Sequence, residues 1–596
     1  MRGREPFGYV VAIDGTKVTL NLKDTYKGQH AAHREGVSSV TEINSLFGID
    51  SGNRILVLRI NSLLFVEPKE VHKYTSYKYR SDVEPLRQIL TNVVGHLKRI
   101  NNLLEFTPDS LSSPALGAEA FPLNDSELTA VIQPNIEIEK CVNVGINIRG
   151  LEAVKINISN FLNRHVAVLG STGQGKSCFI ASVLQQMIKF PNPRIVIFDI
   201  NGEYESAFNN VDHKRLKITK IGGHEEGNYK IPYIALGRHG LSRLLMPSER
   251  TQRPALTFAI DNLNKIKFFS EQNGSGLMDD TAPVLFDDCR PGDASKAWDA
   301  INNLRNGNVK KADKWPHMSS LACLIADSYS LKIDQNKNRI RDSFTYANVS
   351  PLIARIKRFI DDPFFENVID VHGGPFIDST ASWEKEAKKV VSDIFGDDKS
   401  DWNIHIVNLR EITHDLMPII LGALLELLAF ELFNRGQNNT YPSLLVLEEA
   451  HHYLRQYVGD DESGHQNLAY ERLAKEGRKF GLSLFISTQR PSEMSSTVLS
   501  QCGTWVVFRL TSENDLKIIN QASEWADKLE LSRIAGLPRQ QALIFGTSLS
   551  VPIRIQTPTA NPMPKSHDPD FNKWFEDKFL DSRFLDSNFK CSRKAR

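Results

Sequence analysis

The 596-residue sequence contains few cysteines, and their spacing matches no common bridged or metal-binding framework. No two of its six cysteines form a Cys-x-x-Cys pair: Cys141, Cys178, Cys289, Cys323, Cys502 and Cys591. Secreted disulfide frameworks and structural zinc sites both use closely spaced cysteines. The cysteine content therefore argues against a zinc site and predicts a protein of the reducing cytoplasm.

The sequence also lacks a long apolar segment without charge. The N-terminus, MRGREPFGYV, has no continuous apolar run of the secretory type. The nearest candidate for a membrane span, LMPIILGALLELLAFELF from Leu416, carries Glu426 and Glu431. Each carboxylate at that depth in lipid costs about 2.5 kcal/mol or more. We therefore expect a buried helix at this segment and no association with a membrane.

Neither sign of charge dominates, because 72 basic and 71 acidic side chains give a formal net charge of +1. No overall positive field indicates nucleic acid, although a ring or a groove can concentrate charge locally. The composition, 41% hydrophobic and 24% charged residues, is that of an ordinary globular protein. The length is too great for one core and predicts about two to four domains.

Alternating apolar and polar residues mark the N-terminal region. The runs YVVAI and KVTLNL flank Asp14-Gly15, a favourable pair for a tight hairpin, and RILVLRI follows the turn cluster GIDSGN. We predict a small β-barrel over residues 1–95. Residues 83–104 have the apolar spacing of a helix, and TPDSLSSPALGAEAFP has the composition of a linker. Residues 96–140 are therefore predicted to be a helical connector and linker.

Apolar runs recur after residue 140, and several are apolar at nearly every position: HVAVLG, RIVIFDI, WNIHIVNL, SLLVLEEA, LSLFIST and TWVVFRL. Strands covered on both faces, with helices between them, are typical of an α/β domain with a mainly parallel sheet. We predict this core over residues 141–235 and 396–556. Residues 236–395, which include the loop SEQNGSGLMDD, are predicted to form an inserted helical subdomain. Residues 557–596 are predicted to be a tail containing an amphipathic, aromatic segment.

The segment GSTGQGKSC joins the run VAVL to the helical segment FIASVLQQMI. Its spacing is that of a phosphate-binding P-loop, G-x-x-x-x-G-K-[ST]. Glycines let backbone N–H groups close around phosphate oxygens, and the helix adds its positive N-terminus. Lys176 supplies a point charge for the β- and γ-phosphates, and Ser177 a hydroxyl for Mg²⁺. The predicted ATP-binding residues are Gly170, Ser171, Thr172, Gly173, Gln174, Gly175, Lys176, Ser177 and Cys178. The motif predicts a P-loop NTPase core of the RecA-like type.

Acidic residues follow two of the predicted strands. The segment LLVLEEAHHYL places Glu448 and Glu449 at the ligand-binding edge of the sheet. One of these acids can hold the Mg²⁺ shell while the other polarises the attacking water. The segment FDINGEY places Asp199 and Glu203 after another strand. These two acids either face the nucleotide or lie in a solvated turn.

Two further groups of polar residues surround the run LSLFIST. Thr488, Gln489 and Arg490 end this strand and can sense the γ-phosphate. The segment ERLAKEGRKFG, just before it, contains four basic residues: Arg472, Lys475, Arg478 and Lys479. A basic helix is most often a solvated face. In a ring ATPase, however, each subunit completes the site of its neighbour, and arginine suits that role through its fixed charge and fork geometry.

The order GSTGQGKS, DINGEY, EEAHHYL, EGRKFG, ISTQRPS and VLSQCGT resembles the HerA branch of the FtsK–HerA superfamily of ring translocases. The resemblance covers about residues 145–555, and the predicted barrel is similar to the N-terminal barrel of HerA proteins. It implies a homohexamer that hydrolyses ATP with Mg²⁺ between subunits and drives double-stranded DNA through its pore. Glu448 stands where family members often have aspartate, and its extra methylene lengthens its reach to magnesium.

The resemblance also implies residue roles and partners. Catalytic roles fall to Lys176, Glu449, Arg478 and Gln489, with Arg472 as the alternative trans-acting arginine, and magnesium binding falls to Ser177 and Glu448. HerA proteins work with a partner, so a nuclease or sirtuin-type effector is implied, in DNA processing or in bacterial antiphage defence. The alternative is a nucleotide-regulated scaffold that activates the effector with little DNA pumping. The near-neutral charge and the long helical insertion keep that alternative open.

Overall fold

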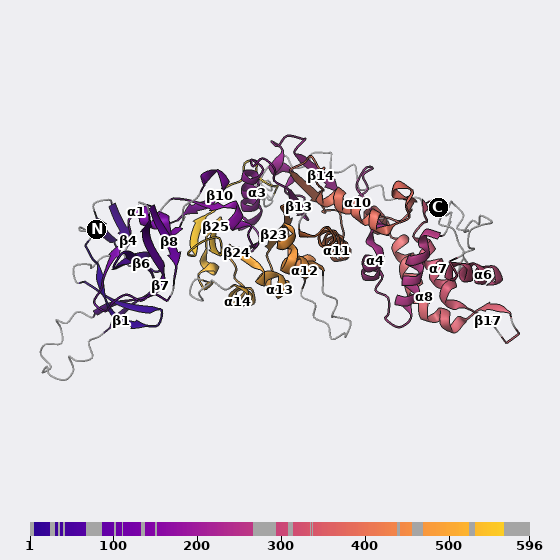
Figure 1. Cartoon of the computed structure of the whole chain (residues 1–596), viewed down its shortest axis with the longest axis horizontal. Coiled ribbons are helices and arrows are strands. Elements are labelled where there is room, and N and C mark those ends of the chain that lie inside the picture. The colour runs from indigo at the N-terminus through magenta and orange to yellow at the C-terminus, as the bar shows by residue number, and fades with distance from the viewer. Residues whose placement is uncertain are drawn as a thin grey trace, which may run out of the picture.

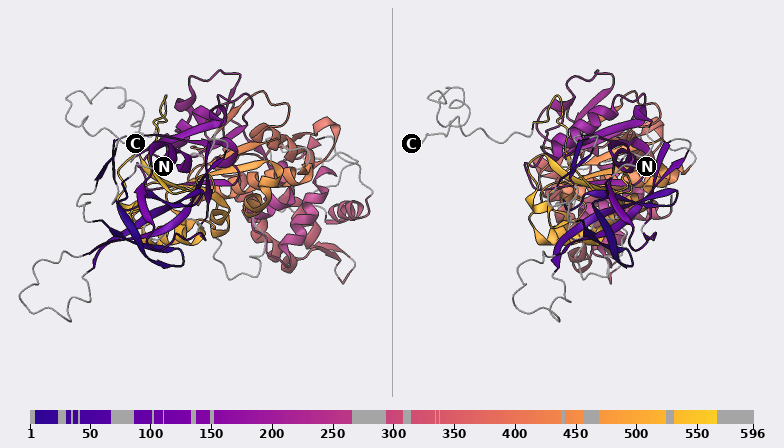
Figure 2. Two further views of the ribbon diagram at one scale, coloured as in Figure 1. Left: turned by 60° about the vertical axis from the view of Figure 1, so that its left-hand side comes forward. Right: turned by 90° about the vertical axis from the view of Figure 1, so that its left-hand side faces the viewer.

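The computed structural model describes residues 5–23, 30–33, 36–39, 42–66, 86–100, 103–109, 111–132, 137–148, 152–265, 294–307, 314–333, 335–336, 338–437, 441–455, 469–523 and 531–565. They form an elongated molecule in three parts: an N-terminal barrel, a central sheet and a helical subdomain (Figure 1). The end-on view of Figure 2 shows the barrel in front of the core. The loop SEQNGSGLMDD and the amphipathic tail segment lie outside the described residues.

Antiparallel strands close the N-terminal barrel in the order β2-β1-β9-β5-β6-β7, and pairing of β7 with β2 completes the ring. The strands are β1 (Gly8–Asp14), β2 (Lys17–Leu22), β5 (Leu46–Ser51), β6 (Arg54–Val66), β7 (Leu86–Ile100) and β9 (Glu119–Pro122). A separate hairpin comprises β3 (His30–His33) and β4 (Gly36–Ser39), and β8 (Leu103–Pro108) pairs with β7. Apolar side chains such as Phe47, Ile49 and Leu58 fill the interior. The predicted barrel and the Asp14-Gly15 hairpin are confirmed.

The predicted helix over residues 83–104 is wrong, because Leu86–Ile100 is the strand β7. Its buried residues alternate along the chain, with Ile89, Thr91, Val93 and Leu97 facing inward. Apolar residues occur on both faces of this strand, so the spacing in the sequence fits a helix as well as a strand. Pairing with β6 along its length decides the outcome. Barrel strands therefore continue beyond residue 95, and helical structure follows only at α1 (Asp125–Ile132) and η3 (Ile138–Lys140).

The central sheet has eleven strands in the order β11-β10-β26-β25-β24-β12-β23-β22-β13-β21-β14. The strands from β24 to β14 are parallel, and the remaining four extend the sheet with antiparallel pairs. The bounds are β10 (Cys141–Asn147), β11 (Ala153–Asn157), β12 (His165–Leu169), β13 (Ile195–Asp199), β14 (Leu216–Lys220), β21 (Ile404–Asn408), β22 (Ser443–Leu447), β23 (Leu482–Thr488), β24 (Cys502–Val507), β25 (Gln541–Gly546) and β26 (Ile553–Gln556). The predicted α/β core with a mainly parallel sheet is confirmed.

Helices cover both faces of this sheet. Along β12, Val166 and Val168 face the side of α3 (Lys176–Met187), whereas Ala167 and Leu169 face the core that contains α11 (Met417–Arg435). This two-sided burial explains the uninterrupted apolar runs of the sequence. The shorter elements of the core are α2 (Ile158–Phe161), η4 (Glu205–Phe208), η9 (Ala450–His452), α12 (Ala469–Glu476), η11 (Gly477–Phe480), η12 (Pro491–Glu493), α13 (Ser496–Ser500), α14 (Glu513–Ala522) and η13 (Ile534–Gly536).

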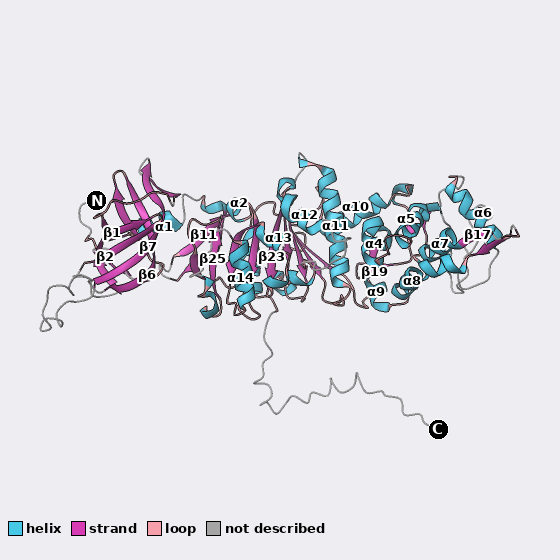
Figure 3. Ribbon diagram, turned by 90° about the horizontal axis from the view of Figure 1, so that it is seen from below, coloured by secondary structure: helices cyan, strands magenta, loops and turns pink. Residues whose placement is uncertain are grey.

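The predicted helical insertion lies between β14 and β21 and forms the end of the molecule opposite the barrel (Figure 3). Its elements are β15 (Ile231–Pro232), η5 (Tyr233–Leu236), α4 (Gly237–Leu245), α5 (Gln252–Asn262), η6 (Leu263–Lys265), α6 (Ala294–Arg305), β16 (Lys314–Trp315), α7 (Ser319–Ser330), β17 (Leu331–Ile333), β18 (Arg339–Arg341), α8 (Ser343–Ile360), α9 (Pro363–Val368), β19 (Ile369–Asp370), β20 (Gly374–Pro375), η7 (Ile377–Ser379) and α10 (Trp383–Phe395). Its apolar side chains share one continuous core with one face of the sheet.

Helix α11 is the segment that the sequence presents as the nearest candidate for a membrane span. By length and composition alone it could cross a membrane, but 61% of its most apolar window is buried inside the protein. The two glutamates of this helix form ion pairs. Glu426 lies 3.7 Å from Arg243. Glu431 lies 3.8 Å from Lys388 and 3.7 Å from Arg435. The predicted buried helix is confirmed.

Gly95 provides a test of the β7 strand. A Cβ atom at this position would lie 2.5 Å from both the carbonyl oxygen of Thr107 and the ring of Phe106. We expect Gly95→Ala to lower the free energy of unfolding by roughly 1–3 kcal/mol through overpacking. In a helix, the same change would raise it by about 1 kcal/mol. Urea denaturation measures the sign, with Gly374→Ala as the control because a Cβ there meets open space. A stabilising Gly95→Ala would contradict the strand.

Candidate nucleotide site

The P-loop occupies the turn between β12 and α3, as its sequence predicts. Gly170 directly follows β12, and a Cβ at this position would lie 2.5 Å from the Cβ of Phe508, so only glycine fits. Lys176 begins α3, and its ammonium group donates to the carbonyl oxygens of Gly170, at 2.8 Å, and Ser171, at 3.3 Å. The lysine therefore lies folded over its own loop, at the helix N-terminus where phosphate oxygens bind.

A second segment, distant in sequence, supports the P-loop from the side of β25. The Arg539 guanidinium donates to the carbonyl oxygen of Gly173 at 2.7 Å. The backbone N–H of Gln540 donates to the carbonyl oxygen of Gln174 at 3.0 Å. No local motif marks these two residues, so they are absent from the sequence prediction. They restrict the loop to a conformation in which its N–H groups stay available.

The acids after β13 and β22 converge beside the P-loop. Asp199 is 0% exposed and Glu448 is 2% exposed. Asp199 accepts the backbone N–H groups of Glu203, at 3.0 Å, and Tyr204, at 2.9 Å, and thereby shapes the turn that carries Glu203. The sequence leaves open whether Asp199 and Glu203 face the nucleotide or lie in a solvated turn. In the structure, both acids lie on the side of the nucleotide site.

Burial dominates the electrostatics of these acids. It raises the pKa of Glu448 well above its ordinary value, and the neighbouring carboxyls of Asp199, Glu203 and Glu449 raise it further. The pKa of Asp199 and that of Glu203 are raised by burial as well. Lys176 is itself buried, which lowers its pKa, although the three nearby glutamates oppose this effect. Three glutamates thus act on one buried ammonium group, and a bound cation would lower the cost of ionising them.

The residues around Ser177 fit a hydrated Mg²⁺ ion. Within the described residues, two buried carboxyl oxygens at this place have no hydrogen-bond partner: Glu203 Oε2 and Glu448 Oε2. The Ser177 hydroxyl interacts with the side chains of Glu203 and Tyr204, and this interaction lowers the pKa of both. Within the described part of the chain, no three His, Cys, Asp or Glu side chains form a ready-made metal cage. Mg²⁺ needs none, since it takes one or two protein ligands and completes its shell with phosphate and water.

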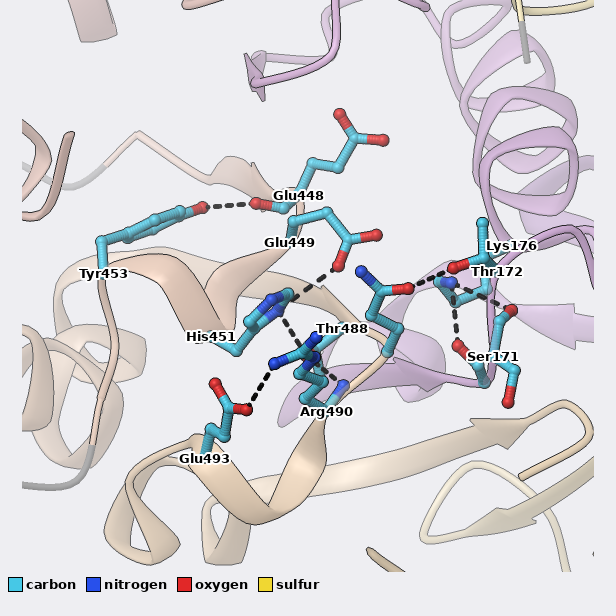
Figure 4. A network of polar contacts seen from close by, with 12 residues as sticks. Ser171, Thr172, Lys176, Glu448, Glu449, His451, Tyr453, Thr488, Arg490 and Glu493 are labelled. Carbon is cyan, nitrogen blue, oxygen red and sulfur yellow. Dashed lines mark hydrogen bonds and ion pairs between the residues drawn. The ribbon is translucent and has the colours of Figure 1, made fainter. Parts of the chain in front are cut away.

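Glu449 lies on the P-loop side of this cluster, in a strained backbone conformation. Its φ of 41° and ψ of 48° are left-handed, which is uncommon for a residue other than glycine. Glu449 Oε2 lies 3.3 Å from Nδ1 of His451, and that nitrogen lies 3.1 Å from Oγ1 of Thr488 (Figure 4). Burial raises the pKa of Glu449, whereas Lys176 and the backbone N–H of Gln489 lower it. Glu448 turns away from this network, so the two adjacent acids face different surroundings (Figure 4).

Gln489 connects Glu449 to the P-loop. Its backbone N–H contacts Glu449, and its side-chain oxygen accepts a hydrogen bond from Thr172 Oγ1. The predicted sensor position of Gln489 therefore lies between the two halves of the site. Arg490 instead forms an exposed ion pair with Glu493 at 2.8 Å. Cys178, at the other end of the motif, accepts the backbone N–H of Ala560 at 3.3 Å and lies against the C-terminal segment.

The structure does not bring Arg478 to this site. Arg478 lies in η11, just before β23 begins, whereas the P-loop lies where the parallel strands end. The residues of β23 separate these edges by roughly 20 Å at about 3.3 Å per residue. Consistently, Arg478 influences His165, the first residue of β12, whose pKa is lowered to about 4 mainly by burial. Arg478 is exposed and, among the described residues, has no ion-pair partner, whereas Arg472 pairs with Glu476 at 3.4 Å and stacks on Phe433. Of the two arginines in this segment, Arg478 is thus the one whose side chain is left available to another molecule.

The parallel sheet, the P-loop and the paired glutamates define a P-loop ATPase. Residues 142–364 match the family model described as "Helicase HerA, central domain". The chain is an ATPase. Two relatives are named "DNA double-strand break repair helicase HerA". The one from Pyrococcus furiosus is 24% identical over 512 residues, covering 78% of this chain and 85% of the relative. The one from Saccharolobus solfataricus is 23% identical over 444 residues, covering 74% and 72%.

Solved structures with similar architecture include VirB4 of Thermoanaerobacter pseudethanolicus, at a TM-score of 0.44 and 16% identity. That match covers 72% of this chain and 98% of the other. The bacterial conjugative coupling protein TrwB gives a TM-score of 0.44 at 13% identity, covering 74% of this chain and 94% of TrwB.

Removal of the Lys176 side chain tests the P-loop. Its ammonium group donates to two carbonyl oxygens of the loop. With nucleotide bound it would donate to phosphate oxygens, and hydrogen bonds to charged groups are worth about 1.5–3 kcal/mol each. We expect Lys176→Ala to weaken ATP binding by roughly 10- to 100-fold, measured by equilibrium titration with a fluorescent nucleotide. Lys189→Ala, an exposed lysine just beyond the same helix, is the control and should leave the affinity unchanged. Equal affinities in all three proteins would refute the assignment of this loop.

Proposed function

We propose that this chain is an ATP-driven double-stranded DNA translocase that works as a ring of its own copies. The observation that carries the proposal is the separation of the nucleotide groups from Arg478 by the length of the parallel strands. A site with P-loop, acids and sensor on one copy, and an unpaired arginine at the far edge, is complete only when two copies meet. Relatives named as double-strand break repair helicases support DNA as the substrate.

Each residue of the site has a role in this proposal. The P-loop from Gly170 to Cys178 holds the phosphates of ATP, and Ser177 with the acids behind it holds Mg²⁺. The metal ion neutralises charge on the phosphates when it is bound. Glu449 orients and polarises the attacking water, Gln489 senses the γ-phosphate, and Arg478 of a neighbouring copy stabilises the transition-state charge. Glu448 contributes to the metal shell from its buried position.

The assignment of Arg478 over Arg472 follows from their surroundings. The contacts of Arg472 with Glu476 and Phe433 would have to break before its guanidinium could enter a neighbouring site. Among the described residues, the Arg478 side chain has no ion pair or ring contact that would have to break. A hexamer is the ring size that the family resemblance implies.

The remaining parts of the proposal concern partners and place. A nuclease or sirtuin-type effector and a role in bacterial antiphage defence come from the resemblance of the motifs alone. Cytoplasmic location agrees with the four described cysteines, all of which are unpaired. The ATPase mechanism depends on neither the effector, the antiphage role nor the location, so it would stand if any of these proposals were wrong.

DNA-stimulated ATP hydrolysis tests the function. We expect double-stranded DNA to raise the rate of hydrolysis, and the stimulation to fall steeply between about 50 and about 200 mM salt, because phosphate contacts release counterions. Phosphate release is measured with and without DNA over that range, and Lys176→Ala gives the background rate. Hydrolysis that ignores DNA at every salt concentration would favour the nucleotide-regulated scaffold instead.

A further inference from the structure

The last described segment of the chain, residues 557–565, runs along α3 beside the nucleotide site, and we call it the C-terminal strap. It starts beside the P-loop support, where the backbone N–H of Thr557 donates to the carbonyl oxygen of Gln540 at 2.9 Å. It then passes α3 at Cys178, which accepts the N–H of Ala560. It ends at Lys565, whose N–H donates to the carbonyl oxygen of Glu203 at 2.9 Å.

One side chain, Gln185 on α3, joins three segments at the middle of this path. Its amide nitrogen donates to the carbonyl oxygens of Ala207, at 2.7 Å, and Pro562, at 2.8 Å. Its amide oxygen accepts the N–H of Asn561 at 2.9 Å. Both donors and the acceptor of this amide are therefore used. Gln185 holds the P-loop helix, the turn after β13 and the strap in one arrangement.

Polar contacts hold the strap at Gln185, next to Ala560, which is buried in the core cluster that includes α3. A cavity of about 440 Å³ lies between the strap, α3 and η4, and its lining includes Gln185, Asn210, Thr559 and Pro562. A segment beside such a cavity has few dispersion contacts to fix its position. Ser206, on the same turn, adds a hydrogen bond from its hydroxyl to the carbonyl oxygen of Met563 at 3.0 Å.

The turn that the strap contacts carries Glu203, whose Oε2 has no hydrogen-bond partner among the described residues. Glu203 and Tyr204 are adjacent on it, and Tyr204 is 0% exposed. The grip is on the backbone of Glu203 itself, so a shift of the strap would move its carboxylate relative to Ser177. Two carboxyl oxygens that lack a hydrogen-bond partner among the described residues, beside a serine hydroxyl, are the chemistry of a hydrated divalent cation.

We propose that Glu203 is a metal-side carboxylate of the nucleotide site and that the C-terminal strap, through Gln185 and Lys565, positions it beside Ser177. This inference rests on the proposed nucleotide-binding function. Glu203 contacts water of the metal shell, Gln185 is a positioning residue, and Glu448 remains deeper in the cluster. The strap thus belongs to the site although it lies more than 350 residues beyond Glu203 in the sequence, as the pairing of Ser206 with Met563 illustrates (|i−j| = 357).

The affinity for a fluorescent ADP, titrated once with Mg²⁺ and once with EDTA, tests this proposal. We expect Glu203→Gln and Gln185→Leu each to weaken binding by about 10-fold in Mg²⁺ and to leave the affinity in EDTA unchanged, since residues around a metal ligand typically affect metal affinity by 10- to 100-fold. Gln186→Leu is the matched control. Gln186 is the next residue of α3 and also makes three hydrogen bonds, but to Asn143 and Ser182. Its replacement should change neither affinity.

The double variant separates positioning from general loosening of the helix. If Gln185 acts through Glu203, Gln185→Leu adds little to Glu203→Gln, because the two effects are coupled. Effects that multiply independently, or a Gln185→Leu loss that is equal in EDTA, would overturn the proposal, and so would Mg²⁺-dependent affinity that survives Glu203→Gln. The proposed function fails on a different observation: normal Mg²⁺-dependent ADP binding by the unmodified chain without any DNA-dependent hydrolysis would overturn the translocase and leave the role of Glu203 intact.

Discussion

The register of the parallel strands determines which side chains meet at the nucleotide site. Leu169, at the end of β12, is paired with Thr488 of β23, and Leu447, at the end of β22, is paired with Ile486. The residues that follow these positions must therefore emerge at one edge of the sheet. Gly170, Glu449 and Gln489 come from distant parts of the sequence, and this register alone makes them neighbours. A shift by one residue would turn each of these strand ends to the opposite face.

The same geometry sets the electrostatics of the site. Strands covered on both faces carry their terminal acids into a buried region, where each carboxylate is expensive to ionise without a counter-charge. Among the described residues, Lys176 is the ammonium group that acts on Glu203, Glu448 and Glu449 together. The orphan oxygens of the cluster and the excess of carboxyl groups both fit a site that takes up a divalent cation with its nucleotide. The left-handed backbone conformation of Glu449 also costs free energy, and the surrounding rigid structure at the end of the strand holds the residue in it.

The sequence is informative where function depends on local chemistry. The P-loop, the two glutamates after β22 and Gln489 are each marked by a short motif at a strand end, and the structure brings them together as predicted. Arg539, Gln540 and Gln185 escape prediction because their contacts join segments that are hundreds of residues apart, with no local pattern. The apolar residues of β7 fit the period of a helix as well as that of a strand, and only the pairing with β6 distinguishes the two. Long-range contacts thus determine the positions of these residues and the conformation of β7, which no short motif indicates.

The central claim is that one nucleotide site uses Glu449 of one copy and Arg478 of another, and mixing two inactive variants tests it directly. Glu449→Gln should lower ATP hydrolysis by roughly 100-fold or more, and Arg478→Ala by roughly 1,000-fold. Mixed rings contain interfaces at which both groups are intact, so hydrolysis should partly return on mixing, while Arg472→Ala alone should remain active. If labelled subunits exchange and the mixture stays inactive, the two residues do not serve a shared site and the account is wrong.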